Sequence, residues 1–331
     1  MNKYLVLKGC AGLGNRLITL TNAIQYATSS NRVLLVDWAD GMFRKKGENV
    51  FYDYFDIKGV THIKSINEIE TFIPKTCYPR IWGQNPKASV YDLYEPNHAN
   101  FLLKFFPSKL HGRLALPHGY WQLKQKSSST INRDWLTIKA FFNRNNIPYG
   151  GKYSNQMKED VVFFADYIPP FSGKFLKKHI EPVSEIQREI NNLANEWKLY
   201  TNTIGVHVRM TDKQPSNSLQ YLKEKISHLN LENYQIFLAT DNIEAEEFFQ
   251  SNFKNIVFTK KWRPNGEARN KGIHQYASRN EDYEMAERQL RESIIDMWLL
   301  SKCEYLIWQE NSSFSRVSAV LKNEPSKTFS W

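Results

Sequence analysis

The chain has 331 residues, of which 41% are hydrophobic and 24% charged, which excludes a wholly disordered polymer and favours two domains. Its net charge of +10 indicates an anionic partner, which can be a nucleic acid, a membrane surface or a small ligand that carries phosphate. Because the basic residues are spread along the chain, a local phosphate site is favoured over a nucleic-acid-binding arm.

The cysteines and the N-terminal residues indicate the compartment. Cys10, Cys77 and Cys303 are widely spaced and form no C-x-x-C pair, which argues against a disulfide framework and favours a reducing environment. No apolar run at the start of the sequence is long enough for a signal peptide or a membrane anchor. We therefore expect a cytoplasmic protein without an integral membrane segment, although peripheral membrane contact stays possible.

The first forty residues are typical of a βαβ unit. Short apolar runs at Tyr4–Leu7 and Arg32–Asp37 predict buried parallel strands. Between them, a glycine-rich loop at Lys8–Asn15 leads into a predicted helix at Arg16–Ser30.

The middle of the chain is less regular. Prolines interrupt each long periodic segment between Gly41 and about Pro182, which predicts short helices and loops around a modest sheet. Lys124–Thr130 is predicted as a loop. Tyr167–Phe175 contains Pro-Pro and Gly and is the predicted interdomain linker.

Strands and helices alternate more clearly after this linker. The predicted helices are Val183–Leu199, Ser218–Leu229, Ile243–Phe253, Glu284–Lys302 and Ser313–Leu321, and the predicted strands are Thr203–Arg209, Tyr234–Thr240, Asn255–Thr259 and Tyr305–Trp308. Repeated βα units imply a parallel sheet with right-handed crossovers. The sequence thus predicts a two-domain α/β protein, with domains at 1–175 and 176–331.

The glycine loop could hold an anion. Gly9, Gly12 and Gly14 lie between a strand and a helix N-terminus, where backbone N–H groups are available. Their spacing matches neither the dinucleotide fingerprint nor a Walker loop, so a tight turn that serves backbone geometry alone is the alternative.

Charged residues end the strand at Thr203–Arg209. Period-two alternation puts His207 and Arg209 on one face at the carboxyl end, the edge where open α/β sheets bind ligands. Asp212 and Lys213 follow. An arginine guanidinium suits phosphate oxygens, and the alternative is an interdomain salt bridge beside a core histidine.

Two acids are also candidates. Asp241 ends a strand, but with Glu244 three residues later it also fits a helix-capping box. Asp296 lies in an apolar helix segment, where an ionised carboxylate needs a partner. It could accept hydrogen bonds from a base edge or a hydroxyl, or form a buried pair with an arginine.

Serines begin the last helix. Ser312, Ser313 and Ser315 can cap it, and its N-terminus can also bind an anion, with Arg316 adding charge. The sequence contains no D-x-D, H-E-x-x-H, paired Cys/His cluster or G-x-S-x-G, so neither a dedicated metal site nor a serine hydrolase is expected.

Together, four motifs resemble the α1,6-fucosyltransferase family, which includes the bacterial nodulation and the animal N-glycan core enzymes, with protein O-fucosyltransferases as distant relatives. The motifs are "KGCAGLGNRL…RVLLVD", "IGVHVRMTDK", "LATDN" and "LRESIIDMWLLSKCEYLIWQENSSFSRV". The resemblance covers about the first 40 residues and 200–322. It implies a GT-B-like fold with two Rossmann-like domains, and inverting, metal-independent fucose transfer from GDP-fucose without a cofactor.

Carried over by position, the resemblance assigns site residues. Arg209 matches the arginine that holds the donor diphosphate, and His207 and Asp296 match nucleoside contacts. The expected catalytic residues are Arg209, Asp212 and Lys213. The expected donor-binding residues are Gly12, Gly14, Asn15, His207, Arg209, Asp241, Asp296, Ser312, Ser313 and Phe314.

The chain also departs from the animal pattern. Met210 stands where the animal enzyme has a second arginine, and Asn217 where it has the glutamate thought to act as base. Asp212 is therefore the candidate base.

Trp82, Trp121 and Trp262 are candidate sugar-stacking rings or core residues. The partners expected are a nucleotide-sugar donor and a carbohydrate acceptor; the alternatives are another nucleotide sugar, or a non-catalytic protein that binds nucleic acid or another polyanion.

Overall fold

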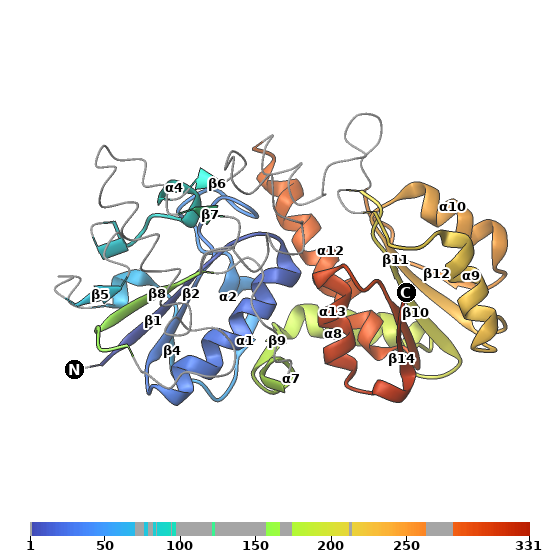
Figure 1. Cartoon of the computed structure of the whole chain (residues 1–331), viewed down its shortest axis with the longest axis horizontal. Helices are drawn as coiled ribbons and strands as arrows, with labels where there is room; N and C mark the ends of the chain where they lie inside the picture. The colour runs from blue at the N-terminus through green and yellow to red at the C-terminus, as the bar shows by residue number, and fades with distance from the viewer. Residues whose placement is uncertain are drawn as a thin grey trace, which may run out of the picture. The chain divides into compact units, whose positions relative to one another are not determined.

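The computed structural model describes residues 2–69, 76–78, 82–83, 85–93, 95–96, 121–122, 157–165, 174–211, 214–262 and 281–331. The chain forms two compact units (Figure 1). The first consists of Met1–Asp53 and Ile57–Ile180, and the second of Tyr54–Asp56 and Glu181–Trp331. Each unit is an α/β structure built on its own sheet, as the sequence predicts.

The first unit contains a five-stranded sheet in the order β4-β2-β1-β8-β5. Every pairing in it is parallel, and its strands are β1 (Tyr4–Lys8), β2 (Val33–Asp37), β4 (His62–Ile63), β5 (Cys77–Tyr78) and β8 (Val161–Phe164). Helix α1 (Leu13–Ser29) connects β1 to β2, so the predicted βαβ unit is confirmed. It begins earlier than predicted, because Gly12 in an extended conformation is its N-cap.

Strand β8 completes the core of the first unit. All four of its residues are buried, and it pairs with β1 although more than 150 positions separate them in sequence. The Trp82 ring is fully buried, stacks on Phe163 at a centroid distance of 5.5 Å and donates its indole N–H to the Ala88 carbonyl. Trp82 is therefore a core residue, and its candidacy as a sugar-stacking ring is wrong.

The second unit contains another parallel five-stranded sheet, in the order β12-β11-β10-β13-β14. Its strands are β10 (Thr203–Val208), β11 (Gln235–Thr240), β12 (Ile256–Val257), β13 (Tyr305–Trp308) and β14 (Thr328–Ser330). Its main helices are α8 (Ser184–Glu196), α9 (Leu219–His228), α10 (Ile243–Asn252), α12 (Tyr283–Lys302) and α13 (Ser313–Lys322). All these elements except β14 are predicted by the sequence to within a few residues.

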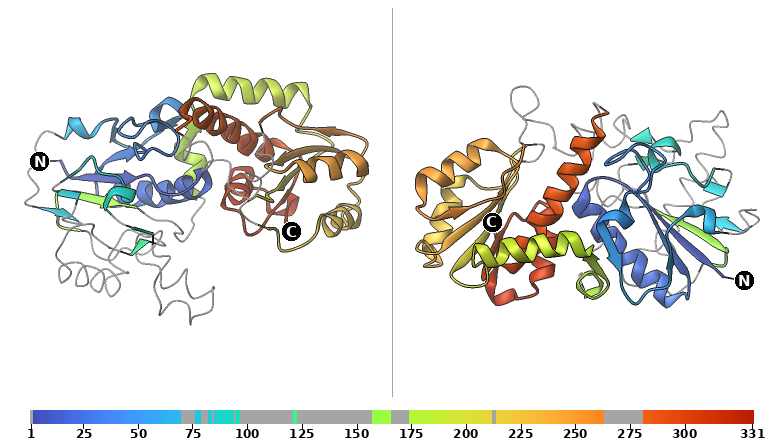
Figure 2. Two further views of the ribbon diagram at one scale, coloured as in Figure 1. Left: turned by 90° about the horizontal axis from the view of Figure 1, so that it is seen from above. Right: turned by 180° about the vertical axis from the view of Figure 1, so that it is seen from behind.

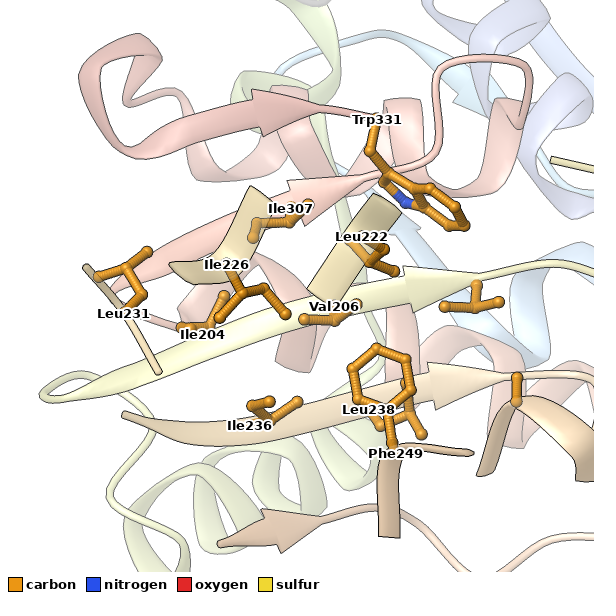
Figure 3. Close-up of a cluster of buried hydrophobic side chains, with 12 residues drawn as sticks. Ile204, Val206, Leu222, Ile226, Leu231, Ile236, Leu238, Phe249, Ile307 and Trp331 are labelled. Carbon is orange, nitrogen blue, oxygen red and sulfur yellow. The ribbon is translucent and has the colours of Figure 1, made fainter. Parts of the chain in front are cut away.

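The two faces of β10 pack against different helices. Ile204, Val206 and Val208 join a hydrophobic cluster with residues of α9 and α10 and with Trp331 (Figure 3). On the opposite face, Gly205 lies against Cys303 and Leu300, and an added Cβ would be 3.1 Å from the Cys303 Sγ. Helix α12 therefore occupies the space beside Gly205. Helices α12 and α13 pack together in this unit, as both views in Figure 2 show.

The remaining elements are short. They are α2 (Phe51–Tyr54), β3 (Phe55–Ile57), η1 (Ile66–Glu68), α4 (Val90–Leu93), β6 (Glu95–Pro96), β7 (Trp121–Gln122), α7 (Lys174–His179), β9 (Ile180–Pro182) and η5 (Pro325–Lys327). The predicted linker at Tyr167–Phe175 is wrong at its end, because Phe175 belongs to α7; its other residues up to Gly173 lie outside the described part. The predicted loop at Lys124–Thr130 also lies outside it.

Cys10, Cys77 and Cys303 are buried and none of them forms a disulfide, so the prediction that they form no disulfide framework is confirmed. Among the described residues, no helix combines the length and the hydropathy that a membrane span needs.

Candidate functional site

The carboxyl edge of the second sheet carries the site. Strand β10 pairs with β11 on one side and with β13 on the other, all parallel. The residues that directly follow these three strands are Arg209, Asp241 and Gln309. They therefore meet at one edge, the position at which open α/β sheets bind ligands.

The backbone of Arg209 is held by the side chain of Gln309. The Arg209 N–H donates to Gln309 Oε1 at 2.7 Å, and Gln309 Nε2 donates to the Arg209 carbonyl at 3.2 Å. The Arg209 side chain is only 16% exposed, and its Nε lies 3.9 Å from Asp241 Oδ2. The guanidinium is thus presented at the sheet edge from a fixed backbone.

Asp241 fixes the residues that follow Arg209. Its Oδ1 accepts the Met210 N–H at 2.9 Å, and its Oδ2 accepts the Thr211 hydroxyl at 2.6 Å. The capping role considered for Asp241 is wrong, because Asn242 is the N-cap of α10 and accepts the Ala245 N–H at 3.0 Å. Asp241 instead supports the turn that leaves β10.

His207 lies buried beside this turn and stacks on the Phe314 ring, with centroids 4.9 Å apart. Its Nδ1 has no hydrogen-bond partner among the described residues. Burial, reinforced by the nearby charges of Arg209 and Lys261, lowers the pKa of His207 to about 3. The imidazole is therefore neutral at physiological pH and can offer a ligand a hydrogen bond but no charge.

The N-terminus of α13 adds backbone N–H donors to the same site. Ser312 is the N-cap of this helix, yet its side chain makes no capping hydrogen bond. The Ser312 Oγ is buried and has no partner within the described structure. Ser315 Oγ donates to the Gln309 carbonyl at 3.0 Å. The helix end and the unpaired hydroxyl together suit an anion or a hydroxylated ligand.

Asp296 is 1% exposed and has two donors near the end of β12. It accepts the Thr259 hydroxyl at 2.6 Å and forms an ion pair with Lys261. The arginine partner considered for this carboxylate is therefore wrong, since its cation is a lysine. A carboxylate accepts up to about four hydrogen bonds, so Asp296 has capacity for a ligand.

The fold of the chain is also that of several solved structures. NodZ α1,6-fucosyltransferase, in a crystal soaked with GDP-fucose, aligns over 97% of this chain and 93% of its own, with a TM-score of 0.60 and 21% identity. Fucosyltransferase NodZ from Bradyrhizobium covers the same shares, with a TM-score of 0.58 and 17% identity. POFUT1 in complex with GDP-fucose aligns over 100% of this chain and 98% of its own, with a TM-score of 0.53 and 12% identity.

The chain has the fold of these fucosyltransferases. The GT-B-like class predicted from the four motifs is therefore confirmed. No sequence-family profile matches the chain, and no curated protein matches it. At these low sequence identities, the comparison shows that the fold is shared.

Other residues singled out in the sequence lie apart from this site or outside the described residues. Asp212 and Lys213 are not among the described residues, so their catalytic roles stay predictions. Asn217 is exposed and directly precedes Ser218, the N-cap of α9. Trp262 is half-buried, whereas the Trp121 side chain is not described.

The glycine loop of the first unit is built around Arg16. This buried arginine pairs with Asp40 at 2.6 Å and lies over the rings of Trp38 and Phe43. An added Cβ on Gly9 would be 2.2 Å from the Arg16 Nη1, so Gly9 is needed for this packing. The structure thus gives this glycine a packing role.

The other loop residues predicted to bind the donor are at the start of α1. Gly12 is its N-cap, Gly14 is buried in its first turn, and Asn15 is half-buried. Their donor-binding roles stay predictions. Within the described part of the chain, no three His, Cys, Asp or Glu side chains are grouped to hold a metal ion.

Sequence reasoning missed Gln309, Lys261 and Thr259 as parts of the site. Gln309 gave a detectable signal, because it directly follows a buried strand at the same edge as Arg209. Lys261 and Thr259 gave none, since their pairing with Asp296 joins segments 35 and 37 residues apart.

Proposed function

We propose that the chain is an inverting, metal-independent glycosyltransferase, which transfers fucose from GDP-fucose to a hydroxyl of a glycan or glycoconjugate. The observation that carries this proposal is Arg209, fixed at the carboxyl edge of the second sheet between Asp241 and Gln309. The fold supports it, since solved fucosyltransferases of the same architecture bind GDP-fucose.

The nucleoside would lie on the face of the sheet that carries His207. The stacked rings of His207 and Phe314 form an apolar wall, and His207 Nδ1 offers a hydrogen bond without charge. Asp296 supplies carboxylate oxygens, which suit the N–H groups on the edge of a guanine base. A neutral imidazole fits a nucleoside contact better than a phosphate contact.

The diphosphate would lie between Arg209 and the N-terminus of α13. Cleavage of the sugar–phosphate bond places negative charge on the leaving diphosphate and positive charge on the sugar. A fixed guanidinium and helix N–H groups, with Ser312 and Ser313 at the helix start, stabilise that charge more in the transition state than in the ground state. They would supply the electrostatic help that a divalent ion gives other glycosyltransferases.

A base must take the proton of the acceptor hydroxyl as this attacks the sugar from the face opposite the leaving group. We assign this role to Asp212, because Asn217 cannot serve as a base. We also propose that Lys213, which follows Asp212 in the sequence, supplies a second cation to the leaving group. The buried cysteines, which form no disulfide, support a reducing compartment, and we propose a cytoplasmic location.

The proposal is tested by GDP release from GDP-fucose in the presence of a panel of glycan acceptors and EDTA. Transfer should persist in EDTA, and Arg209→Ala should lower kcat by about 10²–10³, the usual effect of removing one such donor. Arg188→Ala, at an exposed position on α8, removes the same charge and should leave kcat unchanged. Strict dependence on a divalent metal, or equal losses in both variants, would contradict the mechanism.

A further inference from the structure

Gln309 is a fully buried polar residue at the site. It is 0% exposed and directly follows β13, on the side of β10 opposite to Asp241. Its amide spans the Arg209 backbone, accepting the N–H at 2.7 Å and donating to the carbonyl at 3.2 Å. One side chain thus satisfies both backbone groups of the arginine.

Gln309 is itself held in place. Its Nε2 also donates to Asn311 Oδ1 at 2.7 Å, and its backbone carbonyl accepts the Ser315 hydroxyl at 3.0 Å. Asn311 in turn donates to the Gln214 carbonyl at 2.9 Å. The Gln309 amide is itself buried and both of its ends are bonded, so it has little freedom to rotate.

A glutamine meets the requirements of this position, and the side chains nearest to it in size do not. The contact needs an acceptor and a donor on one side chain, long enough to reach the neighbouring strand end. Asparagine is shorter by one methylene, glutamate lacks the donor, and methionine lacks both groups. The choice of residue therefore matches the two backbone contacts with Arg209.

We propose that Gln309 is a positioning residue, which sets the Arg209 guanidinium for the donor diphosphate by fixing the Arg209 backbone. This inference rests on the proposed function. The amide acts through Arg209. Binding groups must be held to within about 0.5 Å by their supporting residues, and a displacement of about 1 Å can cost roughly 100-fold in rate.

If Gln309 only stabilised the fold, its replacement would affect GDP and guanosine binding alike. Gln235 provides the comparison for this alternative. Gln235 lies at the amino end of β11 in the same sheet, and its Nε2 donates to the Trp197 carbonyl at 2.6 Å and to Thr203 Oγ1 at 3.2 Å. Gln235→Met removes amide contacts of the same kind far from Arg209. It is the matched control for Gln309→Met.

The experiment measures the dissociation constants of GDP and of guanosine by calorimetry. The proteins compared are the wild type, Gln309→Met, Gln235→Met, Arg209→Ala and the double variant Arg209→Ala/Gln309→Met. Guanosine lacks the diphosphate, so it reports on the nucleoside contacts and on folding. If Gln309→Met fails to fold, Gln309→Asn replaces it, since its shorter amide cannot hold both contacts.

Gln309→Met should weaken GDP binding about 10-fold, the equivalent of one lost hydrogen bond, while guanosine binding stays unchanged. Gln235→Met should change neither affinity, and the double variant should bind GDP no more weakly than Arg209→Ala. The inference is overturned if Gln309→Met weakens GDP no more than Gln235→Met, weakens both ligands equally, or adds its full effect to that of Arg209→Ala. Failure of the wild type to bind GDP would overturn the proposed function, and this inference with it.

Discussion

The imidazole of His207 and the ring of Phe314 lie 4.9 Å apart between centroids, with an interplanar angle of 25°. The two residues come from β10 and α13, which are distant in sequence and adjacent at the sheet edge. Their stacking buries the histidine, and burial is the main reason why its pKa falls to about 3.

The low pKa of His207 predicts an acid-dependent loss of stability. An unfolded histidine takes up a proton below about pH 6.5, whereas folded His207 stays neutral down to about pH 3. Its contribution is therefore fully present above pH 6.5 and is lost as the pH falls through that window, with a slope of about 1.4 kcal/mol per pH unit. Urea unfolding at pH 7, 6 and 5 measures this slope.

His207→Gln is the comparison for this prediction, because glutamine does not titrate. The free energy of unfolding of the wild type should fall more steeply with acid than that of His207→Gln, by about 1.4 kcal/mol per pH unit. Parallel pH profiles for the two proteins would contradict the prediction, because they would show that folded His207 takes up a proton in the same pH range as an unfolded histidine.

The ion pair between Lys261 and Asp296 gives a second prediction. Their side chains are 10% and 2% exposed, so removal of one partner leaves the other charge in a poorly solvated position. Lys261→Met should lower the free energy of unfolding by about 3–5 kcal/mol. Chemical denaturation of Lys261→Met, Asp296→Leu and the double variant measures the coupling.

The free energy of unfolding of the double variant should fall by less than the sum of the two single losses. The reason is that the double variant leaves neither charge of this pair without its partner. Strictly additive losses would rule out a direct interaction between Lys261 and Asp296.

Gly9 supplies a prediction for the first unit. A Cβ at this position would be 2.2 Å from the Arg16 Nη1, and Arg16 is confined by its pair with Asp40 and by the Trp38 ring. Gly9→Ala should therefore destabilise the protein by about 1–3 kcal/mol through overpacking. Thermal unfolding measures the effect.

Gly47→Ala is the comparison, since nothing lies within 4 Å of an added Cβ there. Any loss of stability in Gly47→Ala comes from the strain of its φ of +95° and not from overpacking. Arg16→Lys in the Gly9→Ala background should recover part of the lost stability, because lysine has no Nη1 to collide with. A Gly9→Ala protein as stable as the wild type would contradict the packing role of Gly9.

Local sequence patterns predict most of the second unit. Strand β13 has its predicted bounds, because Tyr305–Trp308 is a short apolar run enclosed by polar residues. The alternation along β10 is also observed, since Ile204, Val206 and Val208 join one hydrophobic cluster.

Long-range contacts are what the sequence could not predict. The hydrogen bonds from Gln309 to Arg209 span 100 positions, and no local period indicates them. Tyr54–Asp56 pack with the second unit, where Phe55 lies 5.8 Å from Trp298 between ring centroids. The spacing of Asp241 and Glu244 fits a capping box, but the Asp241 carboxylate instead accepts the Met210 N–H at the end of the neighbouring strand.

The central claim is that the second unit binds GDP-fucose through Arg209. Calorimetry of the wild type and of Arg209→Ala, with GDP-fucose and matched UDP- and ADP-sugars, tests it most directly. The proposed function predicts that the wild type binds GDP-fucose more tightly than the other nucleotide sugars, and that Arg209→Ala loses most of this affinity. Equal affinity for all the sugars, or unchanged binding of GDP-fucose by Arg209→Ala, would contradict it.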